Sequence, residues 1–329
     1  MGCVACSFVR LPGWHLLPLL LSCLALLGGC GGSDDSSRPA PSAAEFPSAK
    51  GKTIAQLLRG SGTKPTKLVI APAAQVFDVG ENRYPFGVFT RGNEQVSDAD
   101  VALYFAKDED KGPVTGPLPA QLTSLETKPA YQAAGGGPAE AQNVYVVPKV
   151  DFDKPGPWVA IAILKGEEGL EASRVPSPVA GDKAVPRVGE KAPSIHTPTA
   201  AEVGGDLAKI DTRVPHDQMH EVDFAEALGK KPIVLVFATP ALCQSRVCGP
   251  VVDVTQQVAD EYEGEADFIH MEVYNDNDPG KGIRPQLRAY HLPTEPWTFL
   301  IDRDGVVRDR LEGAYGVPEL EQAMEKIVG

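Results

Sequence analysis

Two cysteines, Cys243 and Cys248, carry the chemistry that this sequence suggests most clearly. They follow the β-branched apolar run 233–237, which is typical of a central parallel strand, and precede an amphipathic stretch that begins near Pro250. An α/β sheet holds reactive groups between the end of a strand and the start of a helix, where the helix dipole favours a thiolate. The sequence therefore predicts thiol–disulfide chemistry at this turn.

The spacing of the two cysteines constrains the shape of the turn. They are five positions apart, so in a regular helix their Cα atoms would lie about 8.7 Å apart, whereas a disulfide tolerates no more than about 7 Å. Residues 244–247 must therefore bulge as a loop, with regular helix beginning near Cys248. If the sulfurs bond, Cys243 is the more accessible and is assigned as attacking thiol, and the shielded Cys248 as resolving thiol. Arg246 lies between them, where its charge would lower the pKa of either thiol.

The N-terminal residues 1–30 have the features of an export signal. Arg10 precedes the apolar run 16–27, which is shorter than the about 20 residues that span a bilayer and suits a signal peptide. The run ends in LGGC at Cys30, which resembles the lipobox of bacterial lipoproteins. LLSC at Cys23 is a rival lipobox, and an ordinary secretory signal is the alternative. The resemblance implies a protein that is lipidated at Cys30 and anchored to the bacterial cell membrane on its extracytoplasmic side.

This leader also simplifies the cysteine chemistry. The chain has six cysteines, and removal of the leader with acylation of Cys30 leaves only Cys243 and Cys248. Both would then lie outside the cytoplasm, where disulfides persist. They are therefore expected to pair with each other.

Composition excludes some classes of function. The chain has 329 residues, of which 43% are hydrophobic, and this suggests two domains with their own cores. A formal charge of −13 without a basic cluster argues against nucleic acid as a partner. The 33 glycines and 30 prolines favour β-structure and long linkers over bundled helices.

The region before the cysteines reads as an all-β domain. Residues 31–65 are interpreted as a polar tether, residues 66–168 as a β-sandwich of immunoglobulin-like type, and residues 169–200 as a proline-rich linker. Alternation at Val101, Leu103 and Phe105 gives one expected strand a single buried face. The expected strands are 69–71, 75–77, 86–89, 101–105, 144–147 and 158–164. No catalytic set is apparent in them, so a spacer or partner-binding module is predicted.

The remaining residues, 201–329, follow an α/β order. After the first strand and its helix we expect strands at 268–274 and 297–301 and a short helix between them at 285–290. A hairpin through residues 303–305 leads to a strand at 306–311, and a helix at 317–328 closes the chain. Pro296 opens the third strand.

This order of strand, cysteine pair, helix, proline and hairpin resembles that of bacterial membrane-anchored thioredoxin-like proteins. The resemblance implies a thioredoxin-like fold that exchanges dithiol and disulfide with extracytoplasmic substrate proteins, with a redox-active disulfide and no separate cofactor or metal. It also implies that Cys243 is the nucleophile, Cys248 the resolving thiol, and Pro296 a cis-proline that docks a substrate strand. The CxxxxC spacing departs from the family's CxxC, and the acidic residue common on the family's first strand is absent.

Glu295, directly before Pro296, is a further departure, because small or β-branched residues are common there in the family. A carboxylate beside the sulfurs would raise the pKa of Cys243, while Arg246 and the helix terminus would lower it. Glu295 would also be placed to relay the proton that the first strand cannot. The alternative is a solvated loop glutamate without a role.

Three other functions stay open at this point. A copper-delivery protein of the Sco type would use the cysteines with His270 or His291, and residues 216–220 offer further donors. A thiol peroxidase is suggested by Thr239 and Cys243, although the spacing has one residue too many. In the third, the protein is a non-enzymatic binding scaffold and the disulfide is permanent and structural. Closure of so small a loop by a disulfide would, however, stabilise the fold by less than about 3 kcal/mol.

Overall fold

A computed structural model describes residues 37–134 and 140–329 of the chain. The predicted export signal and the predicted acylation site at Cys30 lie outside these residues. None of the helices in the described ranges is both long enough and apolar enough to cross a membrane.

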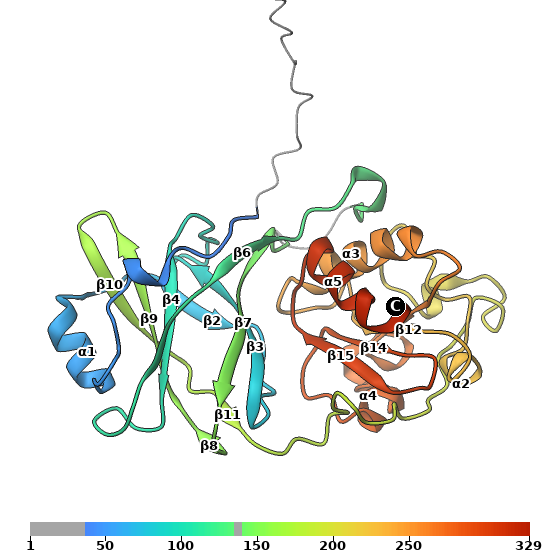
Figure 1. The fold of residues 1–329 in the computed structure, drawn as a ribbon. Coiled ribbons are helices and arrows are strands. Elements are labelled where there is room, and N and C mark those ends of the chain that lie inside the picture. Colours follow the sequence, from blue (N-terminus) through green and yellow to red (C-terminus); the bar gives the residue numbers. More distant parts are fainter. Residues whose placement is uncertain (1–36, 135–139) are drawn as a thin grey trace, which may run out of the picture. The chain divides into compact units, whose positions relative to one another are not determined.

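Two β-sheets that share an apolar core make up the first part of the described chain (Figure 1). Their strands are β1 (Lys64–Pro65), β2 (Val69–Pro72), β3 (Gly80–Phe89), β4 (Val101–Ala106), β5 (Thr115–Pro119), β6 (Gln121–Ser124), β7 (Asn143–Phe152), β9 (Val159–Gly166) and β10 (Gly169–Val175). One sheet has the order β2-β3-β7-β6 and the other the order β1-β10-β9-β4-β5, while β8 (Gly156–Pro157) pairs with β11 (Val179–Ala180). A β-sandwich agrees with this arrangement, and its immunoglobulin-like type stays a prediction.

Strand β4 is buried along its whole length because both of its faces are covered. Val101, Leu103 and Phe105 enter the core between the two sheets, as the period of two in a strand requires. Tyr104 lies on the other face, in a second apolar cluster with Ile54 and residues near it. The outer face of this sheet is therefore covered by the chain segment that precedes the sandwich.

That segment was predicted to be a polar tether, and residues 42–65 are instead folded. They contain the 3-10 helix η1 (Ala43–Glu45), the helix α1 (Ile54–Ser61) and β1. A capping box between Thr53 and Gln56 starts α1, and Ile54 and Leu57 are fully buried. The tether prediction was wrong here because the few apolar residues of one short helix do not stand out from the surrounding sequence until the sheet that buries them is known.

The predicted linker is also partly β-structure. Gly169–Val175 form β10, which pairs with β9 as a hairpin, and Val185, Ala192 and Ile195 are buried farther along the chain. The prolines that suggested an extended linker, at positions 176, 178, 186, 193 and 198, lie outside these strands. Conversely, Phe77 in the predicted strand 75–77 forms only an isolated bridge, with Ala180.

The last part of the chain is a four-stranded sheet in the order β13-β12-β14-β15. Its strands are β12 (Ile233–Phe237), β13 (Asp267–Met271), β14 (Trp297–Ile301) and β15 (Val307–Glu312), and its helices are α2 (Phe224–Ala227), α3 (Cys248–Glu261), α4 (Pro285–Ala289) and α5 (Val317–Val328). Short 3-10 helices occur at η2 (Pro129–Tyr131), η3 (Leu207–Lys209), η4 (Asn275–Asn277) and η5 (Pro279–Lys281).

Strand β12 is the centre of this sheet. It is parallel to β13 and antiparallel to β14. Val234 and Val236 pack in the apolar cluster formed by α3 and α5, and Leu235 and Phe237 pack on the opposite side with residues of α2 and α4. Both faces of β12 are therefore buried, which explains the continuous apolar run in its sequence. The element order is the one that the thioredoxin-like resemblance implied.

The two parts share an apolar cluster and polar contacts. Leu125 and Val144 of the first part, which contains β1 to β11 and is called the β-part below, pack in the same cluster as Val251 of α3. Arg83 on β3 forms a two-pronged ion pair with Glu319 on α5, with one nitrogen–oxygen distance of 2.8 Å. The described residues from 37 onward accordingly form one compact unit.

Candidate functional site

Cys243 and Cys248 form a disulfide, with Cα atoms 6.0 Å apart. Helix α3 begins at Cys248, so the residues between the cysteines bulge out as the spacing predicted. Arg246 takes a left-handed conformation with φ of 62°, which turns the chain back toward the helix. The Oγ atom of Ser245 lies 3.2 Å from the Cys243 sulfur.

The two sulfurs differ in exposure. Cys243 is partly buried, whereas Cys248 is 0% exposed and belongs to the apolar cluster between α3 and the sheet. A nucleophile from solvent can therefore approach Cys243 more readily than Cys248. A thiolate formed at Cys248 would lie at the first residue of α3, where the helix dipole favours negative charge.

The peptide bond between Glu295 and Pro296 is cis, and Pro296 directly precedes β14. The carbonyl of Pro296 accepts a hydrogen bond from the amide of Gly313 at 3.0 Å. A cavity of about 300 Å³ is lined by Thr294 and Glu295 on one side and by Ser245 and Val247 of the cysteine loop on another. The structure thus brings the residue before the cis-proline and the cysteine loop to one cavity.

Glu295 is partly buried in this cavity, and burial raises its pKa above the ordinary glutamate value. The sequence offered two readings of this residue, a titrating neighbour of the thiols or a solvated loop glutamate. Its partial burial excludes a fully solvated loop glutamate, and its action on the thiols stays a prediction.

The β-part supplies the rest of the cavity and touches the cysteine loop directly. Pro72, Phe89 and Asn143 are among its lining residues. The amide of Ala141 donates a hydrogen bond to the carbonyl of Arg246 at 3.0 Å. No sequence pattern indicated this contact, and the β-domain was predicted to be a spacer or partner-binding module.

A glycine marks a second close approach of the β-part. A Cβ atom at Gly249, the second residue of α3, would collide with the carboxylate of Glu140. Farther along α3, Asp253 accepts a hydrogen bond from the amide of Ala133 at 2.9 Å. The β-part is therefore attached along the first turns of the helix that carries Cys248. The glycine directly after Cys248 was a sequence signal that another chain segment approaches the helix closely. It did not identify Glu140 as that neighbour.

A buried polar cluster lies at the carboxyl ends of β12 and β13. It consists of Asp211, Asp217, His220 and His270, which are each at most 2% exposed. His270 Nδ1 lies 2.7 Å from Asp217 Oδ2, and its Nε2 lies 3.1 Å from the carbonyl oxygen of Ala238, on the chain that leads from β12 to the cysteines.

The charged groups in this cluster shift one another's pKa values. Burial alone would lower the pKa of His270, but the negative charge of Asp217 and its hydrogen bond raise that pKa to about 10. Burial would raise the pKa of Asp217, yet the charges of His270 and His220 and their hydrogen bonds keep it well below the ordinary aspartate value. Asp217 and His270 are therefore an ion pair at neutral pH.

The donors considered for copper separate into different environments. His270 and His220 enter the buried cluster, whereas His291 is exposed and Met219 packs in the apolar cluster with Leu125. Among the described residues, no group of histidine, cysteine and carboxylate donors close enough to hold a metal includes Cys243 or Cys248.

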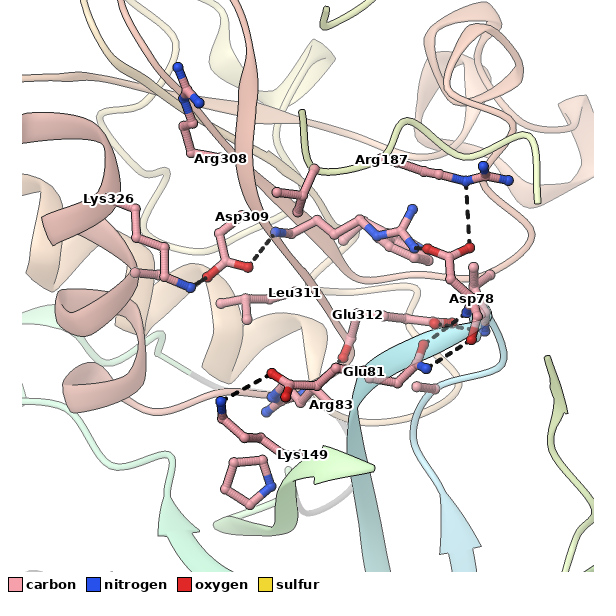
Figure 2. A pocket seen from close by; sticks show the side chains of 18 of the residues that line it. Asp78, Glu81, Arg83, Lys149, Arg187, Arg308, Asp309, Leu311, Glu312 and Lys326 are labelled. Atoms are coloured by element: carbon pink, nitrogen blue, oxygen red, sulfur yellow. Dashed lines mark hydrogen bonds and ion pairs between the residues drawn. The ribbon is translucent and has the colours of Figure 1, made fainter. Parts of the chain in front are cut away.

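A larger cavity, of about 760 Å³, lies elsewhere and has a charged lining (Figure 2). Its charges pair with one another, as in the contacts of Asp78 with Arg310, of Glu81 with Lys149 and of Asp309 with Lys326. The two cysteines are not among its described lining residues. This cavity is therefore no candidate for thiol chemistry.

Comparisons with known proteins add little beyond this geometry. No protein-family profile and no curated protein matches the chain. Among solved structures, a putative thiol:disulfide interchange protein DsbE from Chlorobium tepidum is similar, with a TM-score of 0.32 and 19% sequence identity, over 44% of this chain and 99% of that chain.

Proposed function

We propose that the protein is a thioredoxin-like thiol–disulfide oxidoreductase that exchanges the Cys243–Cys248 disulfide with partner proteins. The observation that carries the proposal is the unequal burial of the two bonded sulfurs at the start of α3. Thiol–disulfide exchange requires one accessible sulfur that a thiolate can attack. It also requires a second sulfur that can leave and later attack the mixed disulfide.

The exchange proceeds through a mixed disulfide. A partner thiolate attacks Cys243 Sγ, a partner–Cys243 bond forms, the Cys243–Cys248 bond breaks, and Cys248 leaves as a thiolate. A second partner thiolate then attacks the partner sulfur of the mixed disulfide and releases Cys243. Two electrons pass from the partner to this protein, and the two protons of the partner thiols end on Cys243 and Cys248 or in solvent. The reverse sequence reduces a partner disulfide.

The cavity beside the cysteine loop is the proposed docking place for the partner segment. Pro296 would position an extended chain, as the thioredoxin-like resemblance implies, Glu295 would act on the thiols as a nearby carboxylate, and Arg246 would favour thiolate formation. Because β-part residues such as Pro72 and Phe89 line the same cavity, the β-part becomes one wall of the docking place. This is the role that we propose for it, in place of a spacer.

The proposed location is extracytoplasmic, with the chain anchored to the bacterial cell membrane through a lipid on Cys30. It is supported by the apolar leader and the lipobox resemblance. A redox disulfide is consistent with this location, since disulfides persist outside the cytoplasm.

Trapping of the mixed disulfide tests the proposal. In Cys248→Ser, the free Cys243 should form a stable mixed disulfide with a peptide disulfide, seen by mass spectrometry and lost on reduction. Cys243→Ser is the matched control and should trap far less, because Cys248 is buried. Equal trapping by both variants, or none by either, would contradict the proposal.

The direction of exchange follows from the reduction potential of the pair. A value near that of thioredoxin, ~−270 mV, would indicate a reductant, and a value near ~−120 mV an oxidant. Equilibration of the intact chain with glutathione buffers, followed by alkylation and mass spectrometry, measures it.

A second candidate is a binding scaffold in which the disulfide is a permanent staple. The backbone hydrogen bond from Ala141 to Arg246 favours it, since it fixes the loop between the cysteines. Under this alternative, mild reductants would leave the disulfide intact in the folded chain, and the potential would lie below about −300 mV.

A further inference from the structure

The cluster of Asp211, Asp217, His220 and His270 has the composition of a metal site. Four side chains from two separate chain segments each offer one donor atom, and these atoms all lie within 4.8 Å of one another. All four side chains are buried. Their chemistry is not used by the exchange reaction of the cysteines.

The donor distances suit a small ion. His220 Nε2 lies 3.3 Å from Asp217 Oδ1 and 3.7 Å from Asp211 Oδ2, and His270 Nδ1 lies 3.9 Å from Asp211 Oδ1. Nitrogen and oxygen ligands of tetrahedral zinc are ~2.0–2.1 Å from the metal, so neighbouring ligands lie ~3.3–3.4 Å apart. Only small side-chain movements separate the observed positions from that geometry.

His220 provides independent support for a ligand. Its side chain is 2% exposed; its Nδ1 has no hydrogen-bond partner among the described residues, and its Nε2 has only the long contacts with Asp217 and Asp211 given above. Buried polar groups in folded proteins are nearly always satisfied, and an unsatisfied one is costly. A cation bound by Nε2, which faces the two carboxylates, would replace these long contacts of Nε2 with a direct bond.

The surrounding contacts hold the other ligands in place. His270 Nε2 lies 3.1 Å from the carbonyl of Ala238 and can donate to it, which leaves Nδ1 to face the centre of the cluster. Metal-binding histidines usually donate their second ring N–H to a carbonyl or carboxylate in this way. The carboxylates are oriented as well, since Asp211 accepts from the amides of Arg213 and Asp217 at 2.7 and 2.8 Å.

Charge and access are also compatible with a divalent ion. Zinc binding would release to solvent the proton that His270 carries in the metal-free ion pair. Two carboxylates with two neutral imidazoles then balance one divalent cation, and the mixed nitrogen and oxygen donors without sulfur suit zinc. His216 provides a route from solvent, because its side chain is 33% exposed and its Nδ1 lies 3.5 Å from Asp211 Oδ2.

From these observations we infer that Asp211, Asp217, His220 and His270 bind one divalent transition-metal ion, with zinc preferred. The ion joins the segment 211–220 to β13, and through Ala238 it supports the base of the loop that carries Cys243. The site is structural and is separate from the cysteines. It differs both from the expectation of no metal and from a copper site that uses the two thiols.

Metal binding by the oxidised, full-length chain tests the inference. The protein is purified in mild detergent, stripped with EDTA and titrated with zinc chloride by calorimetry, and the metal content before stripping is measured by mass spectrometry. We expect one zinc ion per chain and a higher melting temperature in zinc. Cobalt should give the visible absorption of a tetrahedral site without the thiolate charge-transfer band that cysteine ligands add.

Matched variants assign the ligands. His220→Gln and Asp217→Asn should weaken zinc binding at least about 100-fold, since the loss of an outer partner alone costs about 10–100-fold. The controls His291→Gln and the double variant Cys243→Ser/Cys248→Ser should bind zinc as the wild type does. Circular dichroism establishes whether each variant is folded. Absence of stoichiometric binding by the folded wild type overturns the inference without any variant, and so does loss of binding in the double cysteine variant.

Discussion

Two neighbouring regions at the carboxyl end of β12 use polar chemistry in opposite ways. The cysteine loop is partly exposed, bulges between Cys243 and Cys248 and lines a cavity. The cluster around Asp217 and His270 is buried, and its charges are fixed by short contacts. The same strand end thus supports one region that can be attacked from outside and one that cannot. Burial therefore distinguishes a reactive role from a supporting role more clearly than residue type does.

Removal of a charge from the buried cluster should have the largest effect on stability. Asp217→Ala leaves the buried imidazolium of His270 without its main partner, and breaking a buried pair in this way costs about 3–5 kcal/mol. Urea denaturation of the metal-free chain measures the loss. Glu168→Ala, which removes an exposed partner of Lys64, is the control and should change stability by less than about 1 kcal/mol. Equal losses in the two variants would abolish the distinction between the regions.

Gly249→Ala should act on the cysteine loop with little effect on stability. The new methyl group must displace the carboxylate of Glu140 and loosen the contact of the β-part with the start of α3. We expect reduction of the disulfide by dithiothreitol to become several-fold faster. The gain in helix propensity, about 0.5–1 kcal/mol, offsets part of the lost contact.

The double variant Gly249→Ala/Glu140→Ala is the control for this effect, since it removes the collision. It should reduce at a rate closer to that of the wild type. An unchanged rate in Gly249→Ala would show that the contact with Glu140 does not shield the disulfide.

The smallest expected effect concerns Glu295. Because burial raises its pKa, the folded state binds this proton more tightly than the unfolded state does. Ionisation of Glu295 therefore destabilises the fold as the pH rises above the ordinary glutamate value of about 4.3, and the full cost is present above the raised pKa. Glu295→Gln should thus be more stable than the wild type at pH 7, by less than about 1 kcal/mol, and equally stable below pH ~4.

The same variant tests the link between Glu295 and the thiols. Removal of the nearby negative charge should lower the pKa of reduced Cys243 by up to about one unit, measured from its alkylation rate against pH. Glu263→Gln, at an exposed position, should leave that pKa unchanged. If the pKa of the Cys243 thiol does not change in Glu295→Gln, Glu295 has no electrostatic effect on the thiols.

The sequence predicted the α/β part well because its signals are local. The apolar run at Ile233–Phe237 is continuous because both faces of β12 are covered, and the helix boundary at Cys248 followed from the geometry of the cysteine spacing. The folded segment around Ile54 was missed for the opposite reason. The burial of its few apolar residues depends on the sheet that they cover. That sheet is formed by residues far away in the chain, so the local sequence does not predict the burial.

The candidate site was predictable to a similar extent. The cysteine pair and the cis peptide bond at Pro296 carry recognisable spacing and position. The buried cluster does not, since His270 reaches Asp211 and Asp217 only through the folding of β13 beside β12. The contact between Ala141 and Arg246 likewise joins two segments that no sequence pattern relates.

That contact has a mechanical consequence. The hydrogen bond from Ala141 ends on the residue that separates the two sulfurs, and strand β7 begins only a short step after Ala141. Any displacement of Arg246 when the sulfurs part must either break this bond or pull on the entry to β7. Opening of the disulfide would therefore be coupled, through this hydrogen bond, to the start of a strand in the neighbouring sheet.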